Sequence, residues 1–160
     1  MKELVIETKI RAFAVAEVPE EYKILLQAAL EATGRAYAPY SRFQVGAAVL
    51  LSDGKIVAGN NQENAAYPSG LCAERVALFS AGAQYPDLAV KAIAIAAVTE
   101  GSQVDMITPC GGCRQVLLEV EKRYQHPVNV LLYGKDTVYV ADSASALLPL
   151  SFDGSDLPEH

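Results

Sequence analysis

At 160 residues the chain has the size of one domain with a full core, and its 51% hydrophobic and 20% charged residues are ordinary for a globular protein. A net charge of −6 offers no basic surface for a nucleic-acid partner and favours a small, neutral substrate. No apolar run is long enough to span a membrane, so we expect no membrane partner, and the N-terminal residues lack the apolar region of a signal peptide. The odd number of cysteines argues against a secreted disulfide framework. We therefore expect a cytoplasmic protein.

The chain is expected to start with an N-terminal extension, residues 1–18, ahead of a single domain at 19–160. Leu4 to Phe13 mixes apolar and polar residues, so this stretch predicts an edge strand or an arm on a neighbouring subunit. Pro19 then opens a helix that should end near Gly34. Its apolar stripe comprises Tyr22, Leu25, Leu26 and Ala29.

The rest of the chain alternates strands with helices, which predicts an α/β fold with a five-stranded mixed sheet and helices on both faces. The strands are expected at 43–51, 56–59, 92–98, 128–133 and 137–141, with a loop at 99–108. Helices are expected at 72–83, with Val76, Leu78 and Phe79 toward the core, at 110–124 and, as a short segment, at 143–148.

The three cysteines of the chain fall into two clusters, Cys72-Ala73-Glu74-Arg75 and Pro109-Cys110-Gly111-Gly112-Cys113. Each cluster opens a predicted helix, where unsatisfied N–H groups and the helix dipole favour a thiolate. Three protein ligands with a fourth position left for water are typical of catalytic zinc. The pattern therefore predicts a Zn²⁺ site formed by Cys72, Cys110 and Cys113.

Two other interpretations of the cysteines stay open at this point. Cys110-x-x-Cys113 alone is also the pattern of a redox pair, although a redox pair does not need a third thiol followed by a glutamate. A structural zinc knuckle requires four ligands, and neither histidine, His126 or His160, lies near a cysteine cluster.

Glu74 follows the first cysteine by two residues. If it were the fourth metal ligand, no coordination position would remain for the catalytic water. Its useful role is to move protons between water and a substrate ring. Three thiolates leave zinc with a formal charge of about −1, and Arg75 and Arg114 are candidates to offset it.

The order of the motifs resembles the short-chain, homotetrameric cytidine deaminases. The resemblance covers about residues 20–152 and is carried by four segments: 36–48 (Ala-Tyr-Ala-Pro-Tyr-Ser-Arg-Phe-Gln-Val-Gly-Ala-Ala), 61–67 (Asn-Gln-Glu-Asn-Ala-Ala-Tyr), 72–75 and 109–115. It implies a three-layer α/β/α sandwich, one Zn²⁺ per active site, and a homotetramer with shared active sites. Residues 1–18, Asn60, Gln62 and the loop 68–71 depart from the family pattern.

Matched position by position, the resemblance implies specific roles. Cys72, Cys110 and Cys113 match the zinc ligands, and Glu74 matches the proton shuttle. Among the residues that match substrate contacts, Phe43 lies beside the base, and Asn61 and Glu63 bind the ribose hydroxyls. Ala73 contacts the pyrimidine through its backbone, and Tyr67 is a further substrate contact. Phe152, near the C-terminus, matches a residue that reaches the active site of a neighbouring subunit. Arg75 and Gln115 match residues that contact the site residues and not the substrate, with Arg75 beside the zinc thiolates.

Residue spacing supports the ribose assignment independently. Asn61 and Glu63 are two apart, so an extended backbone points both side chains to one side, where an amide and a carboxylate can bind vicinal hydroxyls.

The expected function is hydrolytic deamination of cytidine and 2′-deoxycytidine, as in pyrimidine salvage. Deamination of blasticidin S is disfavoured by the pair Asn61 and Glu63, since that sugar lacks the diol. A non-catalytic zinc-stabilised binding protein is disfavoured by Glu74, for which it would have no use.

Overall fold

The computed structural model describes residues 1–155 and residue 157. One seven-stranded mixed sheet has the spatial order β1-β7-β6-β4-β2-β3, with β5 paired to β4. The strands are β1 (Ile10–Ala14), β2 (Phe43–Leu51), β3 (Ile56–Asn60), β4 (Val90–Thr99), β5 (Ser102–Gln103), β6 (Asn129–Tyr133) and β7 (Thr137–Ala141). β4 and β6 are parallel, and every other pair is antiparallel.

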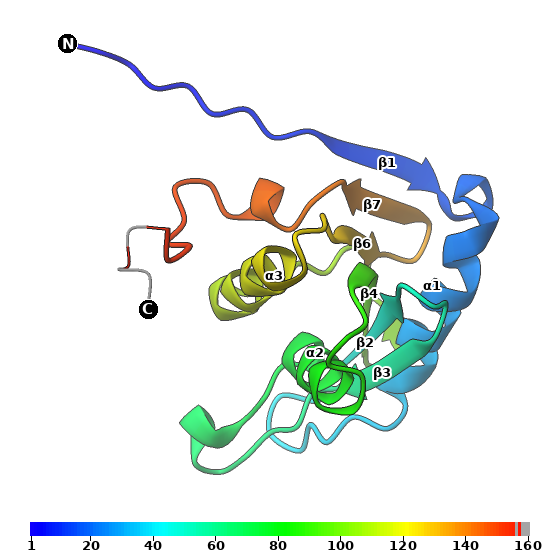
Figure 1. Ribbon diagram of the computed structural model, residues 1–160. Coiled ribbons are helices and arrows are strands. Elements are labelled where there is room, and N and C mark those ends of the chain that lie inside the picture. The colour runs from blue at the N-terminus through cyan, green and yellow to red at the C-terminus, as the bar shows by residue number, and fades with distance from the viewer. Residues whose placement is uncertain (156, 158–160) are drawn as a thin grey trace.

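Three helices cover the sheet in two layers (Figure 1). Helix α1 (Glu20–Thr33) packs on one face, where Leu25, Leu26 and Ala29 meet alternate residues of β4. Helices α2 (Ala73–Gln84) and α3 (Gly111–Tyr124) pack on the other face. The three-layer α/β/α arrangement is therefore confirmed. Within the described residues, no helix combines the length and the apolar composition needed to cross a membrane.

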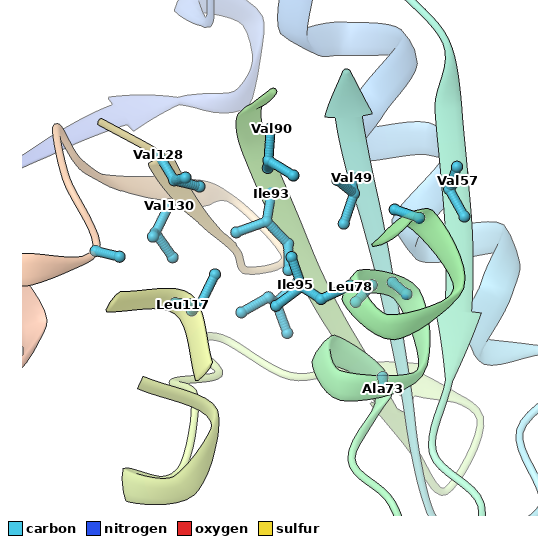
Figure 2. Close-up of a cluster of buried hydrophobic side chains, with 14 of the residues drawn as sticks. Val49, Val57, Ala73, Leu78, Val90, Ile93, Ile95, Leu117, Val128 and Val130 are labelled. Atoms are coloured by element: carbon cyan, nitrogen blue, oxygen red, sulfur yellow. The ribbon is translucent and has the colours of Figure 1, made fainter. Parts of the chain in front are cut away.

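The larger hydrophobic cluster lies between the sheet and the pair α2 and α3. Figure 2 shows Ile93 and Ile95 of the central strand β4 pointing toward Leu117 of α3 and Leu78 of α2. All four side chains are buried, and full burial of an aliphatic side chain of this size stabilises the fold by about 1.5–3 kcal/mol. Residues 92–97 of β4 are buried on both faces, as the uninterrupted apolar run predicts. This cluster fixes the two helices that begin at the cysteines.

The prediction of five strands was wrong, because the sheet has seven. The edge strand expected as one alternative for Leu4 to Phe13 is present as β1, which is held mainly by backbone pairing with β7. Its residues are largely exposed, so its sequence carries only a weak strand signal and it is not among the five predicted strands. β5 follows a tight turn in which Glu100 and Gly101 both have positive φ, of 51° and 77°. Such a turn returns the chain antiparallel to β4 within what the sequence indicates as a loop. The short helix predicted at 143–148 is a single 3₁₀ turn, Ser145–Leu147.

The predicted core position of Phe79 was also wrong, since its side chain is 51% exposed. Helix α2 turns its small residues toward the sheet, with Ala73, Ala77 and Ala81 buried. Gly59 of β3 permits this approach, because a Cβ added there would lie 2.5 Å from the backbone nitrogen of Ala77. The close contact between α2 and β3 turns Phe79 outward.

Replacing Gly59 with Ala should destabilise the protein by about 1–3 kcal/mol, because the added methyl group meets rigid backbone and displaces α2. The free energy of unfolding in urea measures the effect. Gly34→Ala is the matched control, since its Cβ would have only the Glu31 carbonyl oxygen nearby, at 3.6 Å, and its φ of −65° suits alanine. If both variants unfold at the same urea concentration, Gly59 does not set the position of α2.

Candidate active site

The three cysteine sulfurs converge where α2 and α3 begin. Cys72 is the residue before the first turn of α2, and Cys110 occupies the same position before α3. The Cys110 and Cys113 sulfurs are 3.5 Å apart, and those of Cys72 and Cys110 are 3.9 Å apart. All three thiols are free, and Cys113 is fully buried beneath the other two. The sequence prediction that two helix starts point at one centre is confirmed.

This donor set fits a zinc ion. Two sulfurs bound to one tetrahedral zinc at about 2.3 Å lie roughly 3.8 Å apart. The observed separations bracket that value, and the three sulfurs all lie within 4.8 Å of one another. A disulfide would need sulfurs at about 2 Å, so the three cysteines stand as separate thiols. The third sulfur, of Cys72, completes a set of three donors that a redox pair does not need.

The electrostatics of the triad favour a thiolate at Cys72. A hydrogen bond from the Cys113 thiol lowers the pKa of Cys72 to about 5, and the Arg75 guanidinium adds to this effect. The Arg75 Nη2 atom lies 3.7 Å from the Cys72 sulfur. The pKa of Cys113 is raised, because its proton is held by Cys72 and its side chain is buried. A metal that binds here therefore meets one ligand already deprotonated, at Cys72, and displaces the proton that Cys113 donates to it.

Glu74 lies in the first turn of α2, directly after Ala73, and its side chain is only 4% exposed. Burial raises the pKa of this carboxyl group, and the neighbouring Cys72 thiolate raises it further. A positioned carboxyl group with a raised pKa is suited to accept a proton and to release it again. Glu74 and Ala73 both line the cavity described next, so the acid faces a space that a substrate could enter.

A cavity of about 690 Å³ opens beside the sulfurs, a size typical of small-molecule sites. Its walls come from the loop before β2, from the segment that joins β3 to α2, and from residues 107–110 ahead of α3. Of the residues that the sequence assigns to a site, the cavity is lined by Asn61, Glu63, Tyr67, Cys72, Ala73, Glu74, Arg75 and Cys110. At its mouth the rings of Tyr40 and Tyr67 meet edge to face, with centroids 6.2 Å apart.

Asn61 and Glu63 have a structural role that their spacing did not indicate. Asn61 Oδ1 accepts a hydrogen bond from the Val45 N–H at 2.8 Å, and Asn61 Nδ2 donates to the Phe43 carbonyl at 2.9 Å. The Glu63 carboxylate accepts bonds from the Tyr40 N–H and from the Ser41 N–H and hydroxyl. The bond from the Ser41 hydroxyl is the main reason that the pKa of Glu63 is lowered. Both side chains thus hold one wall of the cavity in place, and each keeps acceptor capacity for a ligand.

Five further residues with a predicted role lie outside the cavity lining. Phe43 begins β2 and is half-buried, and Cys113 lies beneath the other cysteines. Gln115 Nε2 donates to the Phe152 carbonyl at 2.9 Å, while the Phe152 ring is 63% exposed. Arg114 does not face the sulfurs, because it donates to the carbonyls of Pro109 and Leu147 at 2.9 Å each. Of the two arginines considered for charge compensation, Arg75 is the one beside a sulfur.

The lining residues to which sequence reasoning gave no site role include Tyr40, Ile107 and Thr108. Their positions in the sequence could have indicated that they lie at the site. Tyr40 belongs to the segment before β2 that carries the family resemblance, and Ile107 and Thr108 directly precede Pro109 and Cys110. Residues adjacent in sequence to a metal ligand are carried to the same site by the backbone.

Comparison with known proteins agrees with this geometry. Residues 19–125 match the family model for the cytidine and deoxycytidylate deaminase zinc-binding region. A cytidine deaminase from Mycobacterium tuberculosis is 40% identical over 146 residues, which cover 88% of this chain and 96% of that protein. One from Halalkalibacterium halodurans is 46% identical over 98 residues, which cover 61% of this chain and 70% of that protein.

The fold comparison leads to the same family. The crystal structure of a cytidine deaminase from Burkholderia pseudomallei superposes with a TM-score of 0.69 at 43% identity, covering 82% of this chain and 98% of that one. The matched family region contains the helix starts, the cysteine triad and Glu74. The chain therefore belongs to the cytidine and deoxycytidylate deaminases, a family of zinc-dependent hydrolytic enzymes.

Proposed function

We propose that this enzyme deaminates the free nucleosides cytidine and 2′-deoxycytidine to the corresponding uridines with release of ammonia, as pyrimidine salvage requires. The observation that carries the proposal is the position of a buried acid, Glu74, between a triad of thiols and a cavity large enough for a nucleoside. The free thiols favour a reducing compartment, which fits an enzyme of the cytoplasm.

In this proposal Cys72, Cys110 and Cys113 hold a zinc ion, and zinc bound there supplies a Lewis acid that makes water nucleophilic at neutral pH. Glu74 takes one proton from the attacking water and delivers it to N3 of the pyrimidine. It then takes the second proton of that oxygen and delivers it to the departing amine, which leaves as ammonia. Arg75 offsets the negative charge of the thiolates, and Ala73 contacts the base through its backbone. Phe43 supports the base, and Gln115 supports the C-terminal segment. Tyr40 and Tyr67 restrict access of water at the mouth of the cavity.

The charge of the cavity favours a nucleoside over a nucleotide. Among the described residues that line it, Arg75 is the sole cation, and its guanidinium is directed at the Cys72 sulfur. The carboxylates of Glu63 and Glu74 line the same space. A phosphate needs positive partners, and two carboxylates would repel it. We therefore expect cytidine to be accepted and cytidine 5′-monophosphate to be rejected.

The direct test is the loss of cytidine absorbance in the ultraviolet with purified, zinc-loaded protein. Cytidine and 2′-deoxycytidine should both be converted, with ammonia formed in equal amount. The same assay with cytidine 5′-monophosphate and with blasticidin S measures the selectivity. Conversion of the monophosphate at the rate of the nucleoside would contradict the proposal, and so would a zinc-loaded protein that converts neither nucleoside.

Asn61→Ala should lower kcat/KM for cytidine by roughly 5–150-fold, the loss expected when a bound hydroxyl is left without its partner. Because Asn61 also holds the backbone of β2, activity on cytidine alone cannot separate the two roles. The discriminating substrate is 2′,3′-dideoxycytidine, which lacks both hydroxyls. A ribose contact predicts a smaller loss on that substrate than on cytidine, whereas a purely structural role predicts equal losses. Ser41→Ala is the control that loosens the same wall without touching the sugar.

We further propose a homotetramer in which neighbouring subunits complete each active site. The support is a group of apolar residues near the cavity mouth and the C-terminal segment that this chain leaves exposed, Tyr67, Leu71, Leu150 and Phe152. The backbone of the C-terminal segment is anchored to α3, through Gln115 to the Phe152 carbonyl and through Lys122 to the Asp153 carbonyl at 2.7 Å. An anchored backbone with an exposed aromatic ring suits a contact with another subunit.

Light scattering at micromolar concentration should give a mass of about four chains. Phe152→Ala should reduce turnover while leaving zinc content unchanged, because the ring would exclude water from a neighbour's site. Sharing can be tested by reassembling Phe152→Ala and Glu74→Gln protomers together. The Glu74→Gln protomer then supplies the Phe152 that a neighbouring Phe152→Ala protomer lacks, and that neighbour keeps its own Glu74. The mixture should therefore be more active than the sum of its parts. An active monomer, or no gain on mixing, would contradict shared sites.

A further inference from the structure

The N-terminal arm, defined here as residues 1–9, continues β1 in an extended conformation away from the layered body of the protein (Figure 1). The family model begins at residue 19, and the Burkholderia structure is matched over 98% of its length while 82% of this chain is matched. The arm and β1 therefore lie outside the matched family region, which contains the cysteine triad and Glu74. None of these residues lines the cavity beside the cysteines.

The arm and β1 together have two different faces. In an extended chain alternate residues share a face, so Leu4, Ile6 and Ile10 lie on one side, and Glu7, Lys9 and Arg11 lie on the other. The three apolar side chains are 76%, 48% and 39% exposed. An apolar stripe of this kind is stable when another surface covers it.

The arm also presents unsatisfied backbone. β1 is the last strand of the sheet and pairs only with β7, so its other edge is free in the described part of the chain. Between residues 1 and 9 no backbone group forms a hydrogen bond with another backbone group of the described residues. Among the described residues, the one hydrogen bond from this stretch is donated by the Thr8 hydroxyl to the Ala146 carbonyl. An exposed strand edge is a template for pairing with another chain.

We propose that this edge pairs antiparallel with the same edge of a second copy, across a two-fold axis at Thr8. In that register Glu7 of each copy lies opposite Lys9 of the other, and Ile6 lies opposite Ile10. Leu4 then meets Ala12, and Val5 meets the aliphatic part of Arg11. The sequence of the arm is thus complementary to itself in both charge and hydrophobicity, as an isologous contact requires.

Neighbouring registers are worse for identifiable reasons. A slip by one residue brings the apolar face of one copy beside the charged face of the other. A symmetric pair centred on residue 7 places Glu7 opposite Glu7, and one centred on residue 9 places Lys9 opposite Lys9. Like charges directly opposite each other destabilise a strand pair. The pairing about Thr8 avoids both penalties.

The register can be tested by cross-linking in the full-length enzyme. In the proposed pair the two Thr8 Cβ atoms are about 4.5–5.5 Å apart, close enough for a disulfide after Thr8→Cys and mild oxidation. A cross-linked dimer should then appear on a denaturing gel. Glu3→Cys is the matched control, because two copies of residue 3 lie at opposite ends of the paired stretch. The wild type, oxidised in the same way, measures any cross-linking through Cys72, Cys110 or Cys113. No dimer with Thr8→Cys, or equal yields with Glu3→Cys, would overturn the proposal.

Charge reversal in the Thr8→Cys background tests the pairing itself. Glu7→Lys alone or Lys9→Glu alone places like charges opposite each other twice in each dimer, and the yield of cross-linked dimer below saturation should fall about tenfold. The combination of Glu7→Lys with Lys9→Glu restores opposite charges and should restore the yield. Failure of the combination to recover would show that residues 7 and 9 are not partners. Deaminase activity should stay constant throughout, so failure here is distinguishable from failure of the proposed function.

Discussion

Glu74→Gln should retain its zinc and its fold but lose turnover by roughly 10²–10⁴-fold, the contribution expected of a positioned general acid–base group. The amide has nearly the size and shape of the carboxyl group, so the first turn of α2 is preserved. It cannot take up a proton from water, however, and within the cavity no second acid occupies the same position beside the sulfurs. Steady-state kinetics with cytidine and zinc content per chain are the two measurements.

The unfolding free energy of the Glu74→Gln variant provides the control. Burial raises the pKa of Glu74, so the folded protein binds the proton more tightly than the unfolded chain. The wild-type protein without metal should therefore lose stability as pH rises above the unfolded pKa of Glu74 and should level off above the folded pKa. Glutamine removes that contribution and should leave the protein at least as stable at neutral pH. A variant with near-normal turnover would show that another group moves the proton, and a variant that unfolds more easily would show that the loss of activity is structural.

The sequence was most informative where the local signal was strong. Pro19 and the two cysteine clusters mark the starts of α1, α2 and α3 to within a residue. The predicted strands at 43–51 and 137–141 coincide with β2 and β7, because each is a run of β-forming residues bounded by turn residues. Since the three cysteines lie in the first turns of α2 and α3 or directly before them, their convergence was the part of the site that could be predicted.

The elements that the sequence indicates weakly or wrongly depend on tertiary contacts and backbone conformations that periodicity does not encode. β1 exists as a strand because β7 offers an edge, and β5 exists because of a turn with two residues of positive φ. Phe79 is exposed because Gly59, on another element, lets the alanine face of α2 approach the sheet. Helical periodicity alone cannot choose between two apolar faces when one carries small residues and the other a phenylalanine.

In the substrate cavity, too, the sequence indicated local relationships between residues but not the contacts between distant segments. Spacing correctly indicated that Asn61 and Glu63 share a side, since both line the cavity. It did not indicate that they also bind the backbone of residues 40–45, because those hydrogen bonds join segments that meet only in the folded sheet. Phe43 lies outside the cavity lining in this subunit, and its predicted contact with the base stays a prediction.

Cys113→Ala should abolish zinc binding and all measurable turnover. Cys113 is the buried member of the triad, and its sulfur lies 3.5 Å from that of Cys110, so no other side chain can replace it as a ligand without moving a helix start. The wild type should hold about one zinc per chain in a shell of three sulfurs and one oxygen by X-ray absorption. At about 100 times its Kd, zinc should stabilise the wild type by about 2.7 kcal/mol, whereas the variant should unfold at the same temperature with and without zinc. This thermal shift separates loss of metal from loss of activity.

A wild-type shell of four sulfurs, or a shell with nitrogen from His126, would identify a closed structural site. A zinc-dependent thermal shift that survives in Cys113→Ala would place the metal elsewhere in the molecule.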